Sequence, residues 1–544
     1  MRTAQAIVEI LKREGVEFVI GYPVNPILEF AARADVRPII VRQERTGLHM
    51  ADAVSRVTSG RRIGVFAMQH GPGSENAFGG VAQAWADSVP IVVLPMGYPR
   101  RTTNIPPNFN STVNFRHVTK WAEQMPSGAE VTNVMRRAFT QVRNGRPGPV
   151  LVEIPMDVFG EESGDGEIDY RPATRHRSGP DPAAVAAAAD ALLAAKRPVL
   201  YAGQGVHYAE AWPELLALAE LLALPVATSL QGKSAFPENH RLALGAGGRT
   251  LPEPVHHFLA NADLVLGVGC SFSATDFGVK MPIGKRYIHA TLDPTDVNKD
   301  LESSLALLGD AKLTLEALLG ALRERGVAAR DAAPVAREVA EVRARWLERW
   351  RAKRESDEVP LNPYRVLSEL QRIVDPERVI ITHDSGSPRD QLSPFWVSTR
   401  PLSYIGWGKS TQLGYGLGLA MGAKLARPEK LCINVWGDAA IGFTGMDFET
   451  AVRERIPILS ILLNNFSMAI ELPIMKVSTE KYGATNISGD YAAMARAFGG
   501  YGERVTEPDQ IAPAIRRGIE QTERGTPALI EFLTSKEIEY STFR

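Results

Sequence analysis

The sequence is poor in the features that mark several classes of protein. Only two cysteines, Cys270 and Cys432, occur among 544 residues, and both lie in apolar stretches, which favours buried free thiols over a disulfide framework. Lys plus Arg (61) nearly cancels Asp plus Glu (62), so we expect no nucleic-acid and no membrane partner. No apolar run approaches a membrane span, and Glu9 interrupts the N-terminal amphipathic pattern too early for a signal peptide. We therefore expect a cytoplasmic protein.

Short apolar runs rich in Val, Ile and Leu recur along the chain, each followed by a Gly-containing turn and a helical pattern. Their apolarity is continuous rather than alternating, which is typical of strands buried on both faces of a parallel sheet. The sequence therefore predicts an α/β protein whose mostly parallel sheets are flanked by helices. The runs lie at 16–23, 62–69, 89–97, 148–155, 197–203, 263–270, 377–384, 431–436 and 458–465.

Length and two polar stretches predict three domains. The stretch 160–182 is polar and aperiodic, and the stretch 330–363 is a highly charged helical pattern that ends in prolines. We expect domains at 1–160, 183–325 and 360–544. Residues 63–94 and 431–462 share one plan, a strand, a small-residue turn, a helix and a Pro that opens another strand. This repeat indicates two related sheet domains and a middle domain of different origin.

An aspartate stands at the end of one apolar run. Asp438 follows the run at 431–436, and its neighbours Gly437, Ala439 and Ala440 have little or no side chain. Open parallel sheets bind ligands at the carboxyl ends of their strands, and small residues there let a ligand approach the backbone. The N–H groups of the following helix favour an anion, but a carboxylate repels one. A divalent cation removes that conflict, and Mg²⁺ prefers such oxygen ligands.

Further oxygen ligands are available at the end of the next run. Residues 458–465 end in Asn464 and Asn465, and Asn465 lies 27 positions after Asp438. We expect the Asn465 amide oxygen and the Ser467 backbone carbonyl to bind the same ion. The alternative is that Asp438 caps a helix and the Asn pair forms a turn. Either feature alone fits that alternative better, whereas the two together at successive strand ends favour the metal.

This spacing resembles the cofactor signature of thiamine-diphosphate-dependent enzymes, in which Gly-Asp is followed a little under thirty residues later by Asn-Asn. The chain is similar to the acetolactate synthase and pyruvate decarboxylase group over nearly its whole length, in the order pyrimidine-binding, middle and diphosphate-binding domain. Ala439 replaces the family's usual Gly, as in oxalyl-CoA decarboxylases. The resemblance implies that Asp438, Asn465 and the Ser467 carbonyl hold Mg²⁺, which anchors the diphosphate.

The resemblance also implies a glutamate that activates the cofactor, and Glu44 follows a strand-like stretch at the matching place. In such enzymes this carboxyl group hydrogen-bonds the aminopyrimidine and promotes removal of the thiazolium C2 proton. Burial raises the pKa of a glutamate and suits it to proton exchange near neutrality. The alternative is a solvated residue at a strand end, which is the commoner place for an isolated glutamate.

Residues 69–80 resemble the family's loop that closes over the pyrimidine. His70 stands where the family usually has Ser, and we interpret it as a candidate acid–base or substrate-recognition group, with a structural histidine as the alternative. Leu413 matches the apolar residue that forces the cofactor into its V shape. The other cofactor contacts that the resemblance or the small-residue turn implies are Pro72, Gly73, Asn76, Ser385, Gly386, Gly437, Ala439, Ala440 and Met468.

One motif favours a particular reaction within the family. Residues 464–474 resemble the pyruvate decarboxylase pattern in which Asn-Asn is followed by a helix that carries Ile-Glu. Glu471 matches the glutamate that donates a proton before an aldehyde leaves, and a helix-surface glutamate is the alternative. The paired histidines that accompany this glutamate in pyruvate decarboxylases are not evident in the sequence.

We therefore expect a thiamine-diphosphate- and Mg²⁺-dependent enzyme that decarboxylates 2-oxo acids and releases an aldehyde or joins a second carbonyl compound. The alternatives are an acetolactate-synthase-like carboligase, a 2-hydroxyacyl-CoA lyase or oxalyl-CoA decarboxylase-like enzyme, and a regulatory protein with an inactive cofactor fold. The presence of Glu44, Asp438 and Asn465 argues against the last.

The resemblance also bears on further ligands and on assembly. Residues 201–212 and 267–278 occupy places that hold a flavin in some relatives, but nothing in the sequence indicates FAD here. The expected substrate is a small-molecule 2-oxo acid. The expected assembly is a homo-oligomer, a dimer or tetramer, in which the first domain of one subunit and the third of another build each active site.

Overall fold

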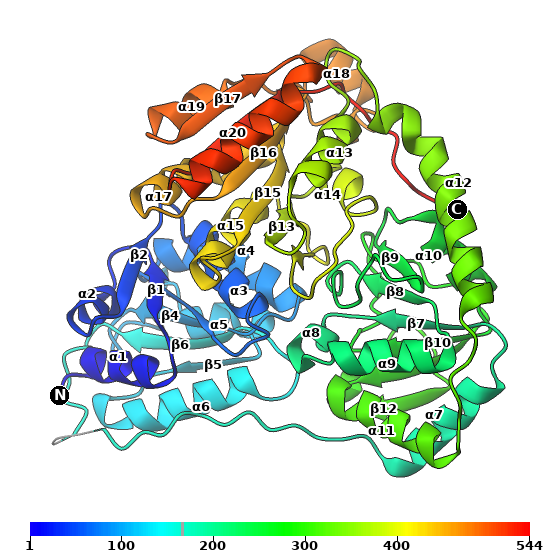
Figure 1. The fold of residues 1–544 in the computed structure, drawn as a ribbon. Coiled ribbons are helices and arrows are strands. Elements are labelled where there is room, and N and C mark those ends of the chain that lie inside the picture. The colour runs from blue at the N-terminus through cyan, green and yellow to red at the C-terminus, as the bar shows by residue number, and fades with distance from the viewer. Residues whose placement is uncertain (165–167, 544) are drawn as a thin grey trace. The chain divides into compact units, whose positions relative to one another are not determined.

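Three β-sheets organise the chain in the computed structural model, which describes residues 1–164 and 168–543 (Figure 1). Each sheet has six strands, and all strand pairs within them are parallel. The predicted α/β class is therefore confirmed. Every apolar run that the sequence analysis interpreted as a strand is one, because these segments are buried on both faces.

The first sheet has the strand order β2-β1-β3-β4-β6-β5. Its strands are β1 (Phe18–Gly21), β2 (Arg37–Ile40), β3 (Gly64–Met68), β4 (Ile91–Gly97), β5 (Trp121–Gln124) and β6 (Val150–Pro155). The helices of this segment are α1 (Thr3–Arg13), α2 (Pro26–Arg33), α3 (Glu44–Arg56), α4 (Pro72–Ala86), α5 (Ser111–Asn114) and α6 (Val131–Arg143). Apolar residues of α1, α2 and α6 pack against the strands in one buried cluster.

The middle sheet has the order β12-β11-β10-β7-β8-β9. Its strands are β7 (Pro198–Ala202), β8 (Val226–Ser229), β9 (Ala243–Gly247), β10 (Leu264–Val268), β11 (Arg286–Thr291) and β12 (Leu305–Leu308). Its helices are α7 (Pro182–Ala194), α8 (Gly205–Ala209), α9 (Trp212–Leu222), α10 (Glu253–Asn261) and α11 (Ala311–Glu324). The charged stretch after it forms α12 (Ala333–Arg354), as its helical pattern predicts.

The third sheet has the order β14-β13-β15-β16-β18-β17. Its strands are β13 (Val379–His383), β14 (Tyr404–Ile405), β15 (Leu431–Gly437), β16 (Leu459–Asn464), β17 (Tyr501–Val505) and β18 (Ala528–Leu533). The helices of this segment are α13 (Pro363–Ile373), α14 (Ser387–Leu392), α15 (Tyr415–Ala426), α16 (Asp438–Thr444), α17 (Phe448–Arg453), α18 (Lys476–Tyr482), α19 (Tyr491–Ala497) and α20 (Ile511–Glu523).

The first and third sheets have the same topology. When strands are counted from one within each sheet, both have the order 2-1-3-4-6-5, whereas the middle sheet has the order 6-5-4-1-2-3. The repeated sequence plan falls on matching elements, because residues 63–94 cover β3, α4 and β4 and residues 431–462 cover β15, α16, α17 and β16. The expected relation between these two segments, and the different character of the middle one, therefore agree with the topology.

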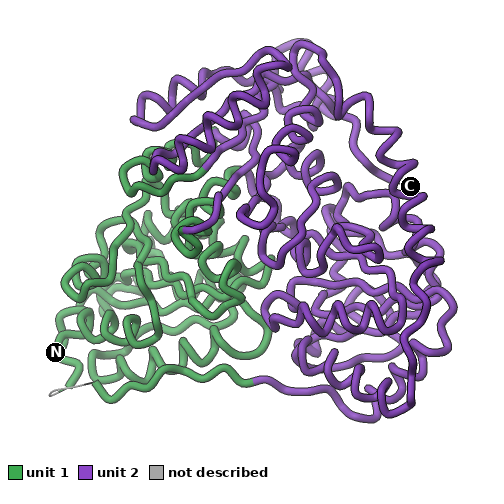
Figure 2. Tube along the Cα trace, viewed as in Figure 1, with its two compact units in different colours: residues 1–176, 414–428, 442–458 green, residues 177–413, 429–441, 459–544 purple. Residues whose placement is uncertain are grey.

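The chain forms two compact units (Figure 2). The first unit contains residues 1–176, 414–428 and 442–458, and the second contains residues 177–413, 429–441 and 459–544. The domain boundaries expected from the sequence stay a prediction, and part of the expected linker 160–182 lies outside the described residues. No helix of the described residues has the length and apolarity needed to span a membrane.

Two glycines allow helix α15 to pack closely on α3 within the first unit. A Cβ atom on Gly418 would lie 2.5 Å from the Cβ of His49, and one on Gly422 would lie 2.1 Å from the backbone oxygen of Met50. Either substitution would force the helices apart. Part of the glycine series at 414–422 therefore serves helix packing.

Candidate functional site

The carboxyl ends of β15 and β16 bring Asp438 and the Asn464–Ser467 turn together. The two strands are parallel neighbours, with Gly437 opposite Leu463. Asp438 is 3% exposed, and its Oδ2 accepts a hydrogen bond of 3.0 Å from the backbone N–H of Ser467. The other oxygen, Oδ1, accepts a hydrogen bond of 2.9 Å from the backbone N–H of Ala439. The expected proximity of these two strand ends is thus present in the fold.

Burial gives the Asp438 carboxylate an unfavourable environment. Loss of solvent raises the pKa of Asp438 to about 6, although backbone N–H groups of Ser467, Ala439 and Asn465 oppose the shift. The main groups that oppose the shift are backbone N–H groups and not charged side chains. A bound cation would supply the missing positive charge and favour the ionised form.

Asn465 has an oxygen without a hydrogen-bond donor. Among the described residues, no group donates to its buried Oδ1 atom, and a buried acceptor without a partner is costly. A divalent cation would satisfy this atom and the carboxylate of Asp438 together. Carboxylate and amide oxygens are hard ligands of the kind that Mg²⁺ prefers, so the donor set fits the expected ion. No three His, Cys, Asp or Glu side chains of the described residues form a metal-binding group elsewhere.

The alternative interpretation, that the Asn pair forms a turn, holds for Asn464 and not for Asn465. Asn464 is fully buried, and its Oδ1 accepts 2.9 Å from the backbone N–H of Phe466, which is the contact that forms the turn. Asp438 bonds the N–H of the next residue rather than the N–H groups two or three residues on that a helix cap uses. The turn is therefore made by Asn464, which leaves the Asn465 amide available for a ligand.

The neighbouring strand contributes the expected diphosphate loop. β13 pairs with β15, and the loop that follows β13 carries Ser385 and Gly386. The Ser385 hydroxyl donates 2.9 Å to the backbone oxygen of Thr411. Gly386 has φ 80° and no atom near the position of a Cβ, so the backbone is open there. Leu413 and Met468, the other expected contacts of this segment, are each half-buried.

The first sheet gathers a second group of predicted residues around Glu44. This glutamate begins α3 and is 5% exposed, and burial raises its pKa while a hydrogen bond with the side chain of Asn76 lowers it. A Cβ on Gly73 would lie 3.4 Å from Glu44 Oε1. Pro72 begins helix α4 on the same loop. The structure thus brings these residues together, and their roles stay predictions.

His70 lies at the end of β3, beside a residue that sequence reasoning missed. Its ring packs edge-on against Tyr98, with centroids 4.7 Å apart, and its buried Nδ1 has no partner among the described residues. Tyr98 follows β4 directly, so the strand-end rule that selected Asp438 would also have selected Tyr98. The pair adds two polar rings to the carboxyl edge of the first sheet.

Glu471 lies in a shorter element than expected. The segment after Asn464–Asn465 forms a three-residue 3₁₀ helix, Ala469–Glu471, instead of the α-helix that the motif predicts. The backbone N–H of Glu471 donates 3.0 Å to the Met468 oxygen, and its side chain is half-buried. Its role as a proton donor stays a prediction.

Asp447 is a further residue that sequence reasoning missed. It is fully buried, and its Oδ1 accepts 2.7 Å from the backbone N–H of Arg42 and 2.8 Å from the hydroxyl of Thr450. The negative charge of Asp447 also raises the pKa of Glu44. A contact between residues 42 and 447 leaves no local pattern in the sequence, so no signal was available.

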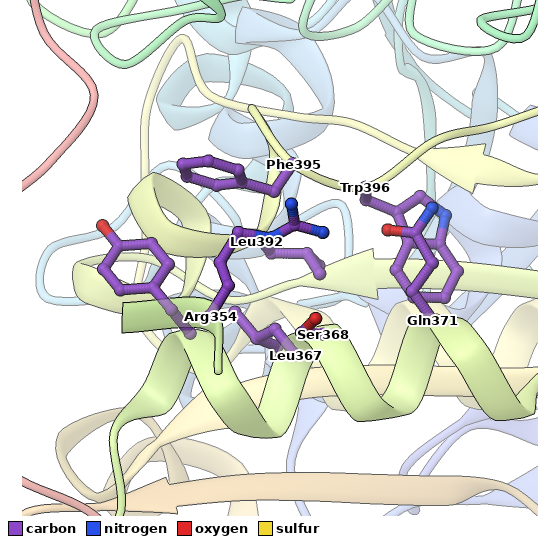
Figure 3. A pocket seen from close by; sticks show the side chains of 8 residues that line it. Arg354, Leu367, Ser368, Gln371, Leu392, Phe395 and Trp396 are labelled. Carbon is purple, nitrogen blue, oxygen red and sulfur yellow. The ribbon is translucent and has the colours of Figure 1, made fainter. Parts of the chain in front are cut away.

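A small pocket in the second unit contains none of the predicted cofactor residues (Figure 3). Helices α13 and α14 supply most of its wall, and the Arg354 guanidinium lies near the ring of Phe395, 5.9 Å from its centroid. The wall is apolar apart from a few groups, so the pocket does not provide the oxygen ligands of the site at β15 and β16. Its lining residues are Arg354, Tyr364, Leu367, Ser368, Gln371, Leu392, Phe395 and Trp396.

Comparison with known proteins gives matches along most of the chain. Residues 1–127, 185–318 and 384–532 match the family models described as thiamine pyrophosphate enzyme N-terminal TPP binding domain, central domain and C-terminal TPP binding domain. The matched segments contain the first, middle and third sheets in that order, apart from strands β6 and β13 and the last residue of β18.

Similar proteins include large subunits named as acetolactate synthases. The acetolactate synthase large subunit of Parasynechococcus marenigrum is 30% identical, over 97% of this chain and 86% of the relative. A probable acetolactate synthase large subunit of Methanocaldococcus jannaschii is 29% identical, over 95% and 90%. The acetolactate synthase isozyme 3 large subunit of Escherichia coli is 28% identical, over 95% and 92%.

Proposed function

Because the chain belongs to the thiamine pyrophosphate enzyme family, we propose that it binds thiamine diphosphate with Mg²⁺ and acts on 2-oxo acids. The reaction that the named relatives favour is carboligation of the acetolactate synthase kind. The observation that carries the proposal is the buried edge of the third sheet, where burial raises the pKa of Asp438 and no group of the described residues donates to the Asn465 oxygen.

When bound, thiamine diphosphate supplies a carbon nucleophile that adds to a carbonyl group and stabilises the negative charge left by departing CO₂. Asp438, Asn465 and the Ser467 carbonyl would hold the Mg²⁺, and Ser385 and Gly386 would contact the diphosphate. The small residues Gly437, Ala439 and Ala440 leave the backbone accessible there. Burial of this edge keeps bulk water from competing with the protein's oxygen ligands.

Glu44 would exchange a proton with the aminopyrimidine. Its burial raises its pKa toward neutrality, and the Asn76 amide holds the carboxyl group in place. His70 and Glu471 are the proposed groups that orient the substrate or donate a proton, and Tyr98 packs against His70 from the adjacent strand end. We also propose a homo-oligomer, a dimer or tetramer, with each site built between subunits, which light scattering with and without cofactor would test.

The experiment that tests the proposal is product analysis by mass spectrometry. The metal-stripped protein receives thiamine diphosphate and Mg²⁺ and is offered a panel of 2-oxo acids and 2-hydroxyacyl-CoA thioesters. Release of CO₂ with a hydroxyketone product supports carboligation, and an aldehyde alone supports simple decarboxylation. Turnover of thioesters alone would replace the proposal by an acyl-CoA lyase. No turnover and no Mg²⁺-dependent cofactor binding would overturn it.

A further inference from the structure

A buried carboxylate lies one strand away from the metal-binding turn. Glu531 is on β18, in the otherwise apolar segment ALIEFL, and its exposure is 0%. Burial of an ionised carboxylate costs several kcal/mol unless charged and hydrogen-bonding partners compensate it. The partners of Glu531 therefore indicate why the residue is tolerated at this place.

Four hydrogen bonds converge on the two oxygens of Glu531. Arg504 donates from Nε to Oε2 and from Nη2 to Oε1, each at 3.1 Å, which is a bidentate ion pair. The backbone N–H of Ala492 donates 2.9 Å to Oε2, and the side-chain amide of Asn464 donates 2.7 Å to Oε1. The charge is thus neutralised, and both oxygens are occupied.

The contact with Asn464 determines the shape of the turn that follows. With its Nδ2 bonded to Glu531, Asn464 presents Oδ1 to the N–H of Phe466 at 2.9 Å. Phe466 has a positive φ of 54°, a conformation that an ordinary residue holds only when its surroundings enforce it. The backbone oxygen of Asn464 accepts 2.8 Å from Thr534, next to β18. Asn464 is therefore fixed on both its amide and its main chain.

The same turn carries the groups that face Asp438. The backbone N–H groups of Asn465 and Ser467 both hydrogen-bond the Asp438 carboxylate. The side-chain oxygen that lacks a donor belongs to the first of these two residues, Asn465. A change in the orientation of Asn464 would therefore move the metal ligand next to it and two contacts of Asp438.

We propose that Glu531 is a positioning residue for the metal-binding turn, and that it holds Asn465 and Ser467 in place through the Asn464 amide. The inference rests on the proposed binding of Mg²⁺ and thiamine diphosphate. Groups that orient metal ligands through a hydrogen bond typically account for about 10–100-fold in metal affinity. Arg504 pairs with the carboxylate through both oxygens, and Oε1 also accepts the hydrogen bond from the Asn464 amide.

The test exchanges the two ends of the Glu531–Asn464 hydrogen bond. Glu531→Gln keeps the size of the side chain but removes the charge that binds Arg504 and Asn464. Asn464→Asp places a second carboxylate against Glu531. In the double variant Asn464→Asp/Glu531→Gln, the amide at 531 can donate to the carboxylate at 464, and one negative charge remains near Arg504. The readout is the Mg²⁺ dissociation constant at saturating thiamine diphosphate, measured by calorimetry on protein whose fold is checked by circular dichroism.

We expect each single variant to bind Mg²⁺ about 10–100-fold more weakly and the double variant to recover most of the loss. The matched control is Glu503→Gln, which removes another glutamate–arginine pair, with Arg517 at 3.0 Å, at the next strand. It should bind as the wild type does. If Asn464→Asp alone does not fold, recovery of both fold and affinity in the double variant still supports the pairing.

Two results would overturn the inference. One is wild-type Mg²⁺ affinity in a folded Glu531→Gln variant. The other is a double variant that is no better than the weaker single variant. Failure of the proposed function would look different, because the wild-type protein itself would then show no Mg²⁺-dependent uptake of the cofactor.

Discussion

The first and third sheets have one strand order and two different carboxyl edges. In both, the central strands are the third and fourth of the local order, β3 and β4 in the first sheet and β15 and β16 in the third. At the first edge the strands lead to His70, Tyr98 and the loop around Glu44. At the third edge they lead to Asp438 and Asn465. A shared scaffold thus places two aromatic rings and a buried glutamate at one edge and the side-chain oxygens of Asp438 and Asn465 at the other.

This difference shows that the strand order sets the place of a site and the residues after the strands set its chemistry. The middle sheet provides a third comparison. Its order is different, and a buried histidine on the adjoining helix α8, His207, has both ring nitrogens hydrogen-bonded, Nε2 to the backbone oxygen of Lys233 and Nδ1 to the indole N–H of Trp212. The edge of the third sheet instead retains the Asn465 oxygen without a donor. The Asn465 oxygen is therefore available to a ligand, whereas both ring nitrogens of His207 are occupied by protein groups.

The largest expected effect comes from Glu44→Gln at the first edge. The amide keeps the size of the side chain but cannot exchange the proton, and general acid–base catalysis is typically worth about 10²–10⁴-fold. We expect kcat to fall by that factor and the affinity for Mg²⁺ and thiamine diphosphate to change little. Steady-state product formation and calorimetry measure the two quantities. Glu29→Gln, an exposed glutamate on α2, is the control, and an unchanged kcat in Glu44→Gln would contradict the assigned role.

A substitution at the edge of the third sheet should instead reduce the affinity for Mg²⁺. Asp438→Asn removes the only carboxylate of the proposed metal site, and we expect Mg²⁺ affinity to fall by at least about 100-fold, beyond the range for residues that merely orient ligands. Burial raises the pKa of Asp438 to about 6, so the ionised group is unfavourable in the cofactor-free protein at pH 8. The cofactor-free variant should therefore unfold at the same temperature as the wild type or a higher one. Calorimetry and thermal melting test both statements, and retained Mg²⁺ affinity would remove Asp438 from the site.

In the middle segment we expect a substitution of His207 to change the pH dependence of folding stability and to leave ligand binding unchanged. Trp212 Nε1 donates 3.0 Å to His207 Nδ1, so the proton of the neutral ring is on Nε2, which donates 3.0 Å to the Lys233 oxygen. Burial lowers the pKa of His207 to about 4, against about 6.5 in an unfolded chain. Below pH 6.5 the unfolded state binds the extra proton, so stability decreases as the pH falls toward 4.

Between pH 7 and pH 5 this linkage is worth about 2 kcal/mol. We expect His207→Gln to flatten that part of the pH dependence of the free energy of unfolding, measured by denaturant titration. His176→Gln, at an exposed position of the first unit, should leave the slope unchanged. Equal slopes in the wild type and His207→Gln would show that the ring is solvated in the folded protein.

The strands that the sequence predicted and those it missed differ in burial. Most predicted strands, such as β3 (GVFAM), are buried at every position, and β1 and β15 are half-buried only at terminal positions. Several missed strands lie at sheet edges, as β5 and β12 do, and β5 (WAEQ) is only half-buried throughout. An edge strand packs on fewer neighbours and needs fewer apolar residues, so its sequence has a weaker pattern. Strand β18, which lies inside the third sheet, was also missed, because Glu531 interrupts its apolar run.

The site was predictable where it depends on strand ends and not where it depends on distant contacts. Asp438 and Asn465 each follow an apolar run, and adjacent strands brought them together. Asp447 and Glu531 act through contacts with Arg42 and Asn464, 405 and 67 residues away. Such partners follow from tertiary packing, and a single sequence contains no signal for them. The charged residue inside the apolar segment ALIEFL was the one visible sign of Glu531.

The smallest expected effect concerns the charge beside Glu44. Burial is the main reason that the pKa of Glu44 is raised, hydrogen bonds with its backbone and with Asn76 lower it, and the negative charge of Asp447 raises it further. Asp447→Asn keeps an oxygen that can accept from the Arg42 N–H and from Thr450, so the loop should hold its shape, but it removes the charge. The pKa of Glu44 should then fall, and the acid-side apparent pKa of kcat/KM should move to lower pH. Glu454→Gln, in the same segment and paired with Arg37 at 2.9 Å, is the control and should leave the profile in place. A shift to higher pH would mean that Asp447 affects Glu44 through its position and not through its charge.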